Sequence, residues 1–242
     1  MNGYRRTAAT DAASTGNDLV ALMATRPERT CLPRFYGRIL TAAEQQGFHS
    51  LEPAGLPFDQ YVWLCWSVKE AVYKYKKRQS PDLRFSPLQI ETHSFTLPFG
   101  SARFFECIVE GPIAVPGTLY SRSLIRDGVI VTTVSEDAEF TGVHWGFSAI
   151  DSVAYADQSS SVRMLALERL KSVLSRDDLE LQKDDADCPI VLAGGEVLPI
   201  PVSLAHHEGH IAYSFRYIDL ASPTAEGPAE GPAEEAAEGL LK

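Results

Sequence analysis

Residues 61–78, with the sequence YVWLCWSVKEAVYKYKKR, contain no glycine or proline and are flanked by Pro57 and Pro81. Its apolar residues recur at three- and four-residue steps, which is the spacing of one face of an α-helix. Trp66, Glu70, Tyr73 and Lys74 fall on a second face, one helical turn apart. We therefore predict a helix over 61–78, with one face for the core and one that suits a phosphate and a metal.

The Glu70 and Lys74 pair also has a simpler interpretation. An exposed pair at this spacing stabilises a helix by about 0.2–0.5 kcal/mol, and basic residues are favourable in a last helical turn. Spacing alone does not separate this interpretation from a functional one.

Residues 16–22, with the sequence GNDLVAL, form a short apolar segment with one carboxylate inside it. This pattern predicts a buried strand with Asp18 near its start. A buried carboxylate is costly unless it is paired or bound to a metal. The alternative is that Asn17 and Asp18 cap the turn that follows.

The remaining pattern predicts further elements on both sides of these two. Thr41 and Glu44 have the spacing of a capping box at a helix start. Gly194 and Gly195 indicate a hairpin. Strands are predicted at 85–91 and from about residue 102 onward, in the segments FFECIVE, GVIVTTVS, VHWGFSAI, VLPIPVSL and HIAYSFRYI. The last of these alternates as a half-buried antiparallel strand does. A helix is predicted at 159–176 with a serine N-cap.

These elements divide the 242 residues into two sections, each with one long helix and several strands. We predict an α+β fold of two pseudo-equivalent halves, residues 15–98 and 99–220, each packing its helix on a small antiparallel sheet. Residues 1–14 are predicted to be a flexible N-terminus. Residues 221–242 carry five glutamates against one lysine, which is typical of a disordered acidic tail.

Composition narrows the classes of function. A formal net charge of −10 argues against non-specific binding to nucleic acid, because such binding needs basic residues that neutralise the phosphates. Four scattered cysteines without a C-x-x-C pair favour a reduced cytoplasm over a disulfide framework, and no secretory signal or membrane span is visible. Ten of the 22 basic residues fall in two short segments and predict a local positive surface: Arg26, Arg29, Arg34, Arg38, Lys69, Lys74, Lys76, Lys77, Arg78 and Arg84.

Three separated segments are similar to motifs of one enzyme family: G-N-D at 16–18, W-S-V-K-E-A-x-x-K at 66–74 and V-S-L-A-H at 202–206. RFYGRILTAAE and FSPLQIE add weaker matches around the second. Together they resemble the 4′-phosphopantetheinyl transferase superfamily, and the resemblance covers most of residues 15–95 and 189–217.

The resemblance implies an enzyme that moves the 4′-phosphopantetheine group of coenzyme A to a serine of an acyl or peptidyl carrier protein and releases adenosine 3′,5′-bisphosphate. Asp18 and Glu70 would bind the metal, and hard carboxylate ligands suit Mg²⁺ or Mn²⁺. Glu70 and Lys74 would be catalytic, with Lys74 on the pyrophosphate. His206 would contact a coenzyme A phosphate, and Arg34 and Arg38 either coenzyme A or the carrier protein.

Two features differ from the larger monomeric members of that family. Val20 stands where those larger members usually have a second acid. In lacking this acid the chain resembles the smaller trimeric carrier-protein synthases. The histidine segment also comes last, as in the smaller enzymes, although this chain is about twice their length. We therefore expect that the second section replaces a neighbouring subunit, so that His206 completes the site within a monomer.

Two alternatives from other classes remain. His206, His207, Glu208 and His210 invite a zinc hydrolase, although Gly209 and the flanking strands do not fit a helical H-E-x-x-H motif. A non-catalytic module that binds a carrier protein or nucleotide is the other. Such a module has no need of two carboxylates beside a polyphosphate, so Asp18 and Glu70 separate it from an enzyme.

Overall fold

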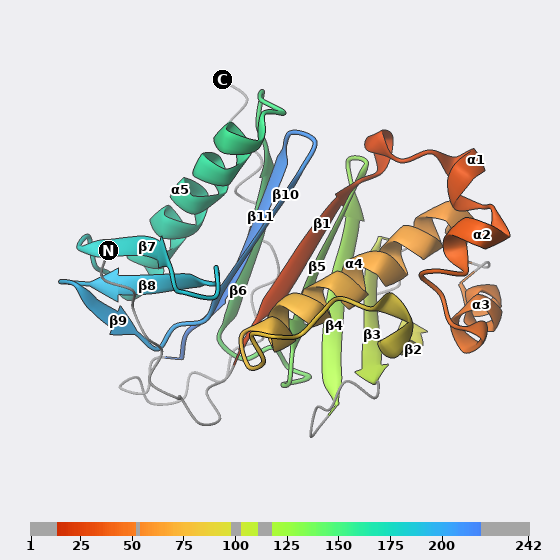
Figure 1. Cartoon of the computed structure of the whole chain (residues 1–242), viewed down its shortest axis with the longest axis horizontal. Helices are drawn as coiled ribbons and strands as arrows, with labels where there is room; N and C mark the ends of the chain where they lie inside the picture. Colours follow the sequence, from red (N-terminus) through yellow and green to blue (C-terminus); the bar gives the residue numbers. More distant parts are fainter. Residues whose placement is uncertain (1–13, 52–53, 98–102, 111–117, 219–242) are drawn as a thin grey trace.

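The computed structural model describes residues 14–51, 54–97, 103–110 and 118–218. The whole predicted tail and all of the predicted N-terminus except Ser14 therefore lie outside the described residues. The fold is mixed α+β with antiparallel sheets (Figure 1). The largest sheet has the order β1-β5-β4-β3-β2. Its strands are β1 (Gly16–Ala21), β2 (Glu91–Thr96), β3 (Phe104–Glu110), β4 (Leu119–Arg126) and β5 (Val129–Ser135).

Helix α4 (Phe58–Lys77) lies across this five-stranded sheet (Figure 1). The predicted apolar stripe forms its buried face, which packs against sheet residues such as Phe105 and Ile130. The short helices α1 (Pro27–Thr30), α2 (Pro33–Tyr36) and α3 (Ala42–Gly47) gather around the N-terminal part of α4. Short 3-10 turns connect these elements: η1 (Leu22–Ala24), η2 (Phe48–Ser50) and η4 (Pro87–Gln89).

The second section, which in the structure begins at β6 rather than at residue 99, contains two three-stranded sheets, β10-β11-β6 and β7-β8-β9. Helix α5 (Tyr155–Leu174) packs on both through a cluster that includes Leu170, Val191 and Phe215. The strands are β6 (Val143–Ala149), β7 (Leu179–Lys183), β8 (Pro189–Ala193), β9 (Glu196–Leu198), β10 (Val202–His207) and β11 (His210–Arg216).

Several sequence predictions are confirmed. Both long helices are present, and the strand with Asp18 runs from Gly16 to Ala21. The capping box also forms, because Thr41 Oγ1 accepts from the Glu44 amide while a Glu44 oxygen accepts from the Thr41 amide. Gly194 and Gly195 have φ of 58° and 84° and connect β8 to β9, as the hairpin signal indicates.

The predicted strand over 85–91 is wrong. Pro87 starts a 3-10 turn, and β2 begins only at Glu91, because proline fixes φ and removes a backbone donor. The serine N-cap of α5 is also wrong, since the helix starts four residues earlier at Tyr155 after Ala154.

The last strand, β11, is buried along nearly its whole length rather than on alternate residues. The reason is its central position in the sheet, between β10 and β6, with α5 packed nearby. A strand covered on both faces has no solvent side, so the half-buried prediction does not hold.

The five-stranded sheet runs across the predicted 98/99 boundary. Strands β3 to β5 pair with β1 and β2, so the described sheets separate between Ser135 and Val143 instead. Strand order is a long-range property that periodicity does not reveal. The two sections also differ in sheet number, and their equivalence stays a prediction.

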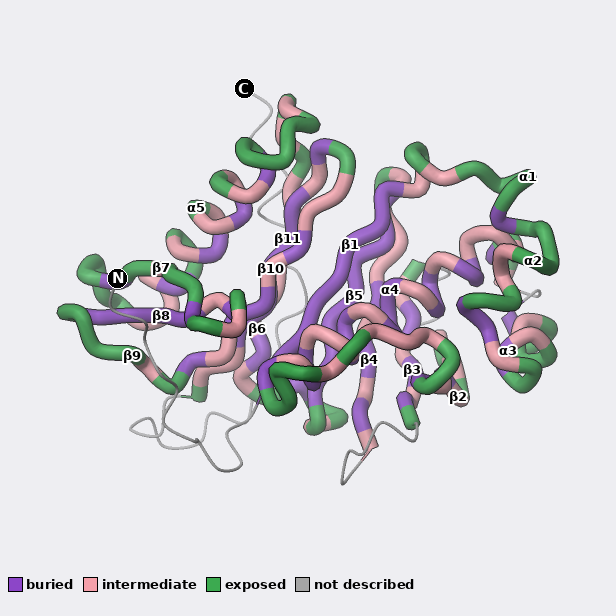
Figure 2. Tube along the Cα trace, viewed as in Figure 1, coloured by how far each residue is buried: buried purple, intermediate pink, exposed green. Residues whose placement is uncertain are grey.

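The two sections meet where β1 lies beside β10, and β1 is buried along its whole length (Figure 2). A shared apolar cluster joins Leu19 and Ala21 of β1 to Ala205 and Ala212 of β10 and β11. In the part of the chain that the structure describes, no helix is both long and apolar enough to cross a membrane.

Candidate functional site

The close approach of β1 to α4 begins at Gly16. A Cβ on this residue would stand 2.0 Å from the Ala71 carbonyl oxygen and 2.8 Å from the Tyr75 amide nitrogen. Both are backbone atoms, which cannot move aside as a flexible side chain does. Only glycine therefore lets the first strand lie directly on the helix, and Asp18, two residues along, faces the same helix.

Asp18, Glu70 and Lys74 form one cluster. The Lys74 ammonium donates to Asp18 Oδ1 at 2.9 Å and lies 3.5 Å from Glu70 Oε1. The Asp18 side chain is only 6% exposed, whereas those of Lys74 and Glu70 are 25% and 29% exposed. The cluster therefore has a buried end at Asp18 and a solvent-facing end on α4.

The electrostatics of the cluster follow from this burial. Burial raises the pKa of Asp18 to about 6; Lys74 partly opposes this increase, and Glu70 adds to it. Burial lowers the pKa of Lys74, but the two carboxylates outweigh that effect and the net pKa is raised. Asp18 thus depends on a nearby cation to remain ionised.

The chemistry of the cluster fits a divalent cation. Asp18 Oδ2 is buried and, among the described residues, has no hydrogen-bond partner. An unpaired buried carboxylate oxygen is costly unless a ligand satisfies it. Asp18 on a strand and Glu70 on a helix would provide hard oxygen ligands for such an ion, and in this structure the Lys74 ammonium pairs with both carboxylates.

Val20 contributes no ligand, because it is buried in the apolar cluster beneath α4. Within the described ranges, no group of three or more histidine, cysteine, aspartate or glutamate side chains is arranged to hold a metal ion. Water and substrate oxygens would therefore have to complete the coordination around Asp18 and Glu70.

Side-chain hydrogen bonds place β10 beside β1. The amide of Asn17 donates to Ser203 Oγ at 3.0 Å, and the amide of Ala21 donates to His207 Nδ1 at 3.0 Å. Both bonds join residues 186 positions apart, so the two strands run in the same direction. This register puts His206 beside Val20, close in sequence to Asp18.

His206 is electrostatically connected to the cluster. Its pKa is lowered, first by burial and then by the positive charge of Lys74. Its ring packs in a T-shaped arrangement with that of Tyr155, the first residue of α5, with ring centroids 4.9 Å apart. The structure thus brings His206 near the α4 cluster within a single chain.

The zinc alternative gains no support. His206 and His207 are adjacent on β10, so their side chains point to opposite faces. His207 Nδ1 accepts from the β1 backbone, and His210 Nδ1 contacts the Glu208 carbonyl. These imidazoles do not converge on one point.

Arg34 and Arg38 are exposed near α2 and do not join the ion pairs of Asp18 and Glu70. The predicted positive surface is also smaller than expected, because Lys69, Lys76 and Arg78 are buried. Lys69 is neutralised by Glu44, and Arg78 donates to the Pro189 carbonyl across the two sections.

Sequence reasoning missed two features of this region. Tyr155 borders His206, and a lone tyrosine at a helix start carries no recognisable signal. Glu44 forms a buried ion pair with Lys69 in addition to its capping role. The T-x-x-E spacing identified the cap, but the partner of the carboxylate depends on how α3 and α4 pack.

Comparison with known proteins adds one finding on the family. Residues 14–111 match the ACPS family model, described as the 4′-phosphopantetheinyl transferase superfamily. The match includes Asp18, Glu70 and Lys74, whereas His206 lies outside it. A search of curated proteins gave no match. The family match confirms the resemblance over this region and supports a transferase.

Proposed function

We propose that this protein transfers the 4′-phosphopantetheine group of coenzyme A to a serine of an acyl or peptidyl carrier protein. The observation that carries the proposal is the cluster of Asp18, Glu70 and Lys74, which combines two carboxylates, one ammonium and a buried oxygen without a partner. The superfamily match over residues 14–111 supports the same reaction class. A binding module has no evident use for this cluster.

In this reaction the serine hydroxyl attacks the phosphorus that carries the pantetheine arm. A new ester bond to the serine oxygen forms as the bond to the bridging pyrophosphate oxygen breaks, and adenosine 3′,5′-bisphosphate leaves. Asp18 and Glu70 would hold Mg²⁺ or Mn²⁺, which neutralises charge on the phosphoryl oxygens when it is bound. Glu70, at the solvent-facing end, would accept the serine proton directly or through water.

Lys74 is paired with Asp18 and Glu70, the same two carboxylates that would bind a divalent ion. We infer that its ammonium would leave Asp18 and Glu70 to contact the pyrophosphate of coenzyme A. One helical turn separates Lys74 from Glu70, so the ammonium needs only to change rotamer. Such a charge would stabilise the leaving group.

His206 would contact another coenzyme A phosphate from the β10 side. A lowered imidazole pKa favours the neutral ring at neutral pH, and a neighbouring phosphate would oppose that effect. Arg34 and Arg38 are exposed on the same section as Glu70, and we assign them to the acidic surface of the carrier protein.

The decisive experiment incubates the full-length protein with coenzyme A, Mg²⁺ and a panel of apo carrier proteins. We expect one carrier to gain the mass of one phosphopantetheine arm, and EDTA to prevent the gain. Mass gain in EDTA would contradict the metal role. Absence of transfer to any carrier in the panel would contradict the proposal.

Two variants then test the coenzyme A contacts. Lys74→Ala and His206→Ala should each raise the KM for coenzyme A by about tenfold, as expected for loss of a charge-assisted phosphate contact. The matched control is Lys171→Ala, a lysine in the last turn of α5, which should leave KM unchanged. Unchanged KM in the first two variants would remove them from the coenzyme A site.

A further inference from the structure

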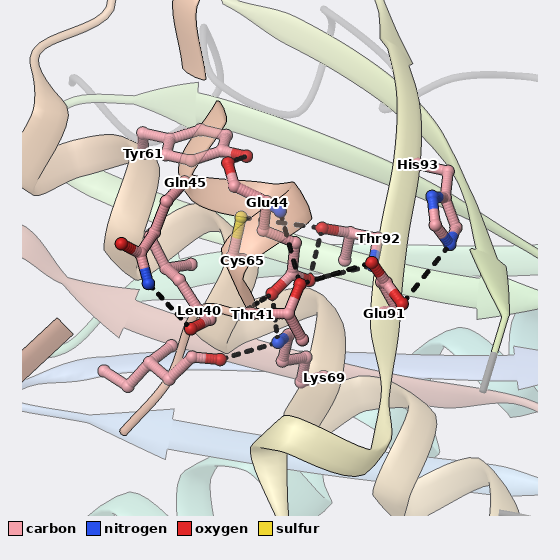
Figure 3. Close-up of polar contacts among 11 residues, drawn as sticks. Leu40, Thr41, Glu44, Gln45, Tyr61, Cys65, Lys69, Glu91, Thr92 and His93 are labelled. Atoms are coloured by element: carbon pink, nitrogen blue, oxygen red, sulfur yellow. Dashed lines mark hydrogen bonds and ion pairs between the residues drawn. The ribbon is translucent and has the colours of Figure 1, made fainter. Parts of the chain in front are cut away.

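A second ion pair joins Lys69 of α4 to Glu44 of α3 (Figure 3), and it is completely buried. Lys69 Nζ lies 2.6 Å from Glu44 Oε2, and both side chains have 0% exposure. The ammonium also donates to the Ile39 carbonyl oxygen at 2.6 Å. Two charges are therefore held out of water between α3 and α4.

Glu44 makes further bonds that fix its carboxylate. Its Oε2 accepts from the Thr41 amide at 2.7 Å, and its Oε1 accepts from both the amide and the hydroxyl of Thr92, each at 2.8 Å. Thr92 belongs to β2, so one carboxylate ties α3, α4 and β2 together (Figure 3). The sequence marked this residue only as part of a cap.

Stability alone does not account for such a pair. Burying each ion costs several kcal/mol, and well-packed apolar residues of similar volume are often as stable as a buried ion pair or more so. A fully bonded polar network does, however, admit only one arrangement of its members. Its specific effect is thus on geometry.

The quantity that this network fixes is the rotation of α4 about its own axis. Lys69 precedes Glu70 directly, so the two side chains leave the helix about 100° apart. Lys69 is anchored to α3 and to the Ile39 carbonyl, while the backbone at Ala71 rests against Gly16 of β1. Any rotation of α4 that breaks the Lys69 contacts would also turn Glu70 away from Asp18.

We propose that the Glu44 and Lys69 pair is a positioning device that holds Glu70 opposite Asp18, an inference that rests on the proposed function. Through the Ile39 carbonyl it also fixes the segment directly after Arg38 relative to α4. Glu44 and Lys69 do not touch the substrate. They act through Glu70.

The test replaces both charges at similar volume in the full-length protein, as the double variant Glu44→Gln/Lys69→Met. We expect it to fold, but to bind Mn²⁺ about tenfold more weakly and to lose about tenfold or more in kcat, as is usual when a supporting contact of a metal ligand is removed. KM for coenzyme A should change less than kcat, because Lys74 and His206 remain. Mn²⁺ affinity is measured by electron paramagnetic resonance without either substrate.

A milder variant covers the case in which the double variant does not fold. Thr92→Val removes one hydrogen bond to Glu44 and keeps both charges, so it should give smaller losses in the same two quantities. The matched control is Val191→Ala, a fully buried change in β8 of the other section. It should lower the unfolding temperature without altering Mn²⁺ affinity or kcat.

The outcomes are distinct. Wild-type Mn²⁺ affinity and kcat in the folded double variant, or in Thr92→Val if only that variant folds, would overturn the positioning role. A wild-type protein that modifies no carrier would overturn the proposed function instead. In that case Mn²⁺ affinity still decides whether the pair positions Glu70.

Discussion

The Ala71 carbonyl oxygen lies 2.0 Å from the position that a Cβ on Gly16 would occupy. Strand β1 and helix α4 are therefore in direct backbone contact at the place where the two metal-ligand candidates approach each other. Because Asp18 and Lys74 each lie within a few residues of this contact, their 2.9 Å ion pair depends on it.

We predict that Gly16→Ala separates β1 from α4 and destabilises the protein by at least about 1–3 kcal/mol, since the added methyl group meets backbone atoms. Thermal unfolding and Mn²⁺ titration would measure the two effects. Gly47→Ala is the matched control, because its Cβ would make only an ordinary 3.5 Å contact at the end of α3. Equal melting temperatures for the Gly16 variant and wild type would refute the prediction.

Asp18→Asn and Glu70→Gln should each abolish most metal-dependent transfer while leaving the protein folded. Each change removes a charged oxygen ligand rather than an apolar contact, and Glu70→Gln should lower kcat by about a hundredfold if Glu70 is the base. Steady-state kinetics with varied Mg²⁺ would measure this. Asp178→Asn, an exposed residue paired with Arg176, serves as control. Full activity in either site variant would eliminate the metal site.

The raised pKa of Asp18 predicts a specific pH dependence of stability in metal-free protein. The pKa rises from 3.8 to about 6 on folding, so the folded state holds the proton more tightly than the unfolded state. This contribution to stability is complete below pH 3.8 and is lost as the pH rises through about 6. Relative to Asp18→Asn, wild type should therefore lose stability across this interval.

Urea unfolding of both proteins in EDTA, at about pH 5 and about pH 7, would measure that difference, because groups common to both cancel. A stability difference that is the same at both pH values would mean that Asp18 titrates normally.

Arg34 and Arg38 are expected to serve the carrier protein rather than coenzyme A. Both are exposed, so their attraction for an acidic partner should be strongly screened by salt. The double variant Arg34→Ala/Arg38→Ala should raise the KM for the carrier several-fold at low salt, with little effect on the KM for coenzyme A. A change in the coenzyme A value alone would reverse the assignment.

The active protein is predicted to be a monomer of two pseudo-equivalent halves. β10 bonds to β1 through His207 and Ser203 of the same chain, and we expect this contact to take the place of a neighbouring subunit. Light scattering at assay concentrations would measure the active mass. Activity found only in a trimeric fraction would mean that the site is shared between chains.

Short-range patterns in the sequence predicted both long helices, strand β1 and the residue types of the site. Helix α4 and strand β1 were predictable because their periodicity and flanking residues act over a few positions, and the motifs around Asp18, Glu70 and Lys74 are equally local. The capping box of Thr41 and Glu44 was predictable for the same reason.

The pairing of the strands and the partners of the charged side chains became clear from the three-dimensional packing alone. Strands β3 to β5 join β1 across the predicted boundary, because strand order depends on contacts between residues far apart in sequence. Lys69 resembled a surface charge until the packing of α3 on α4 placed it against Glu44. The contact between Asp18 and Lys74 likewise joins residues 56 positions apart. It requires a glycine at position 16, because any side chain there would meet the backbone of α4. Such contacts depend on how elements pack in space, which no local pattern records.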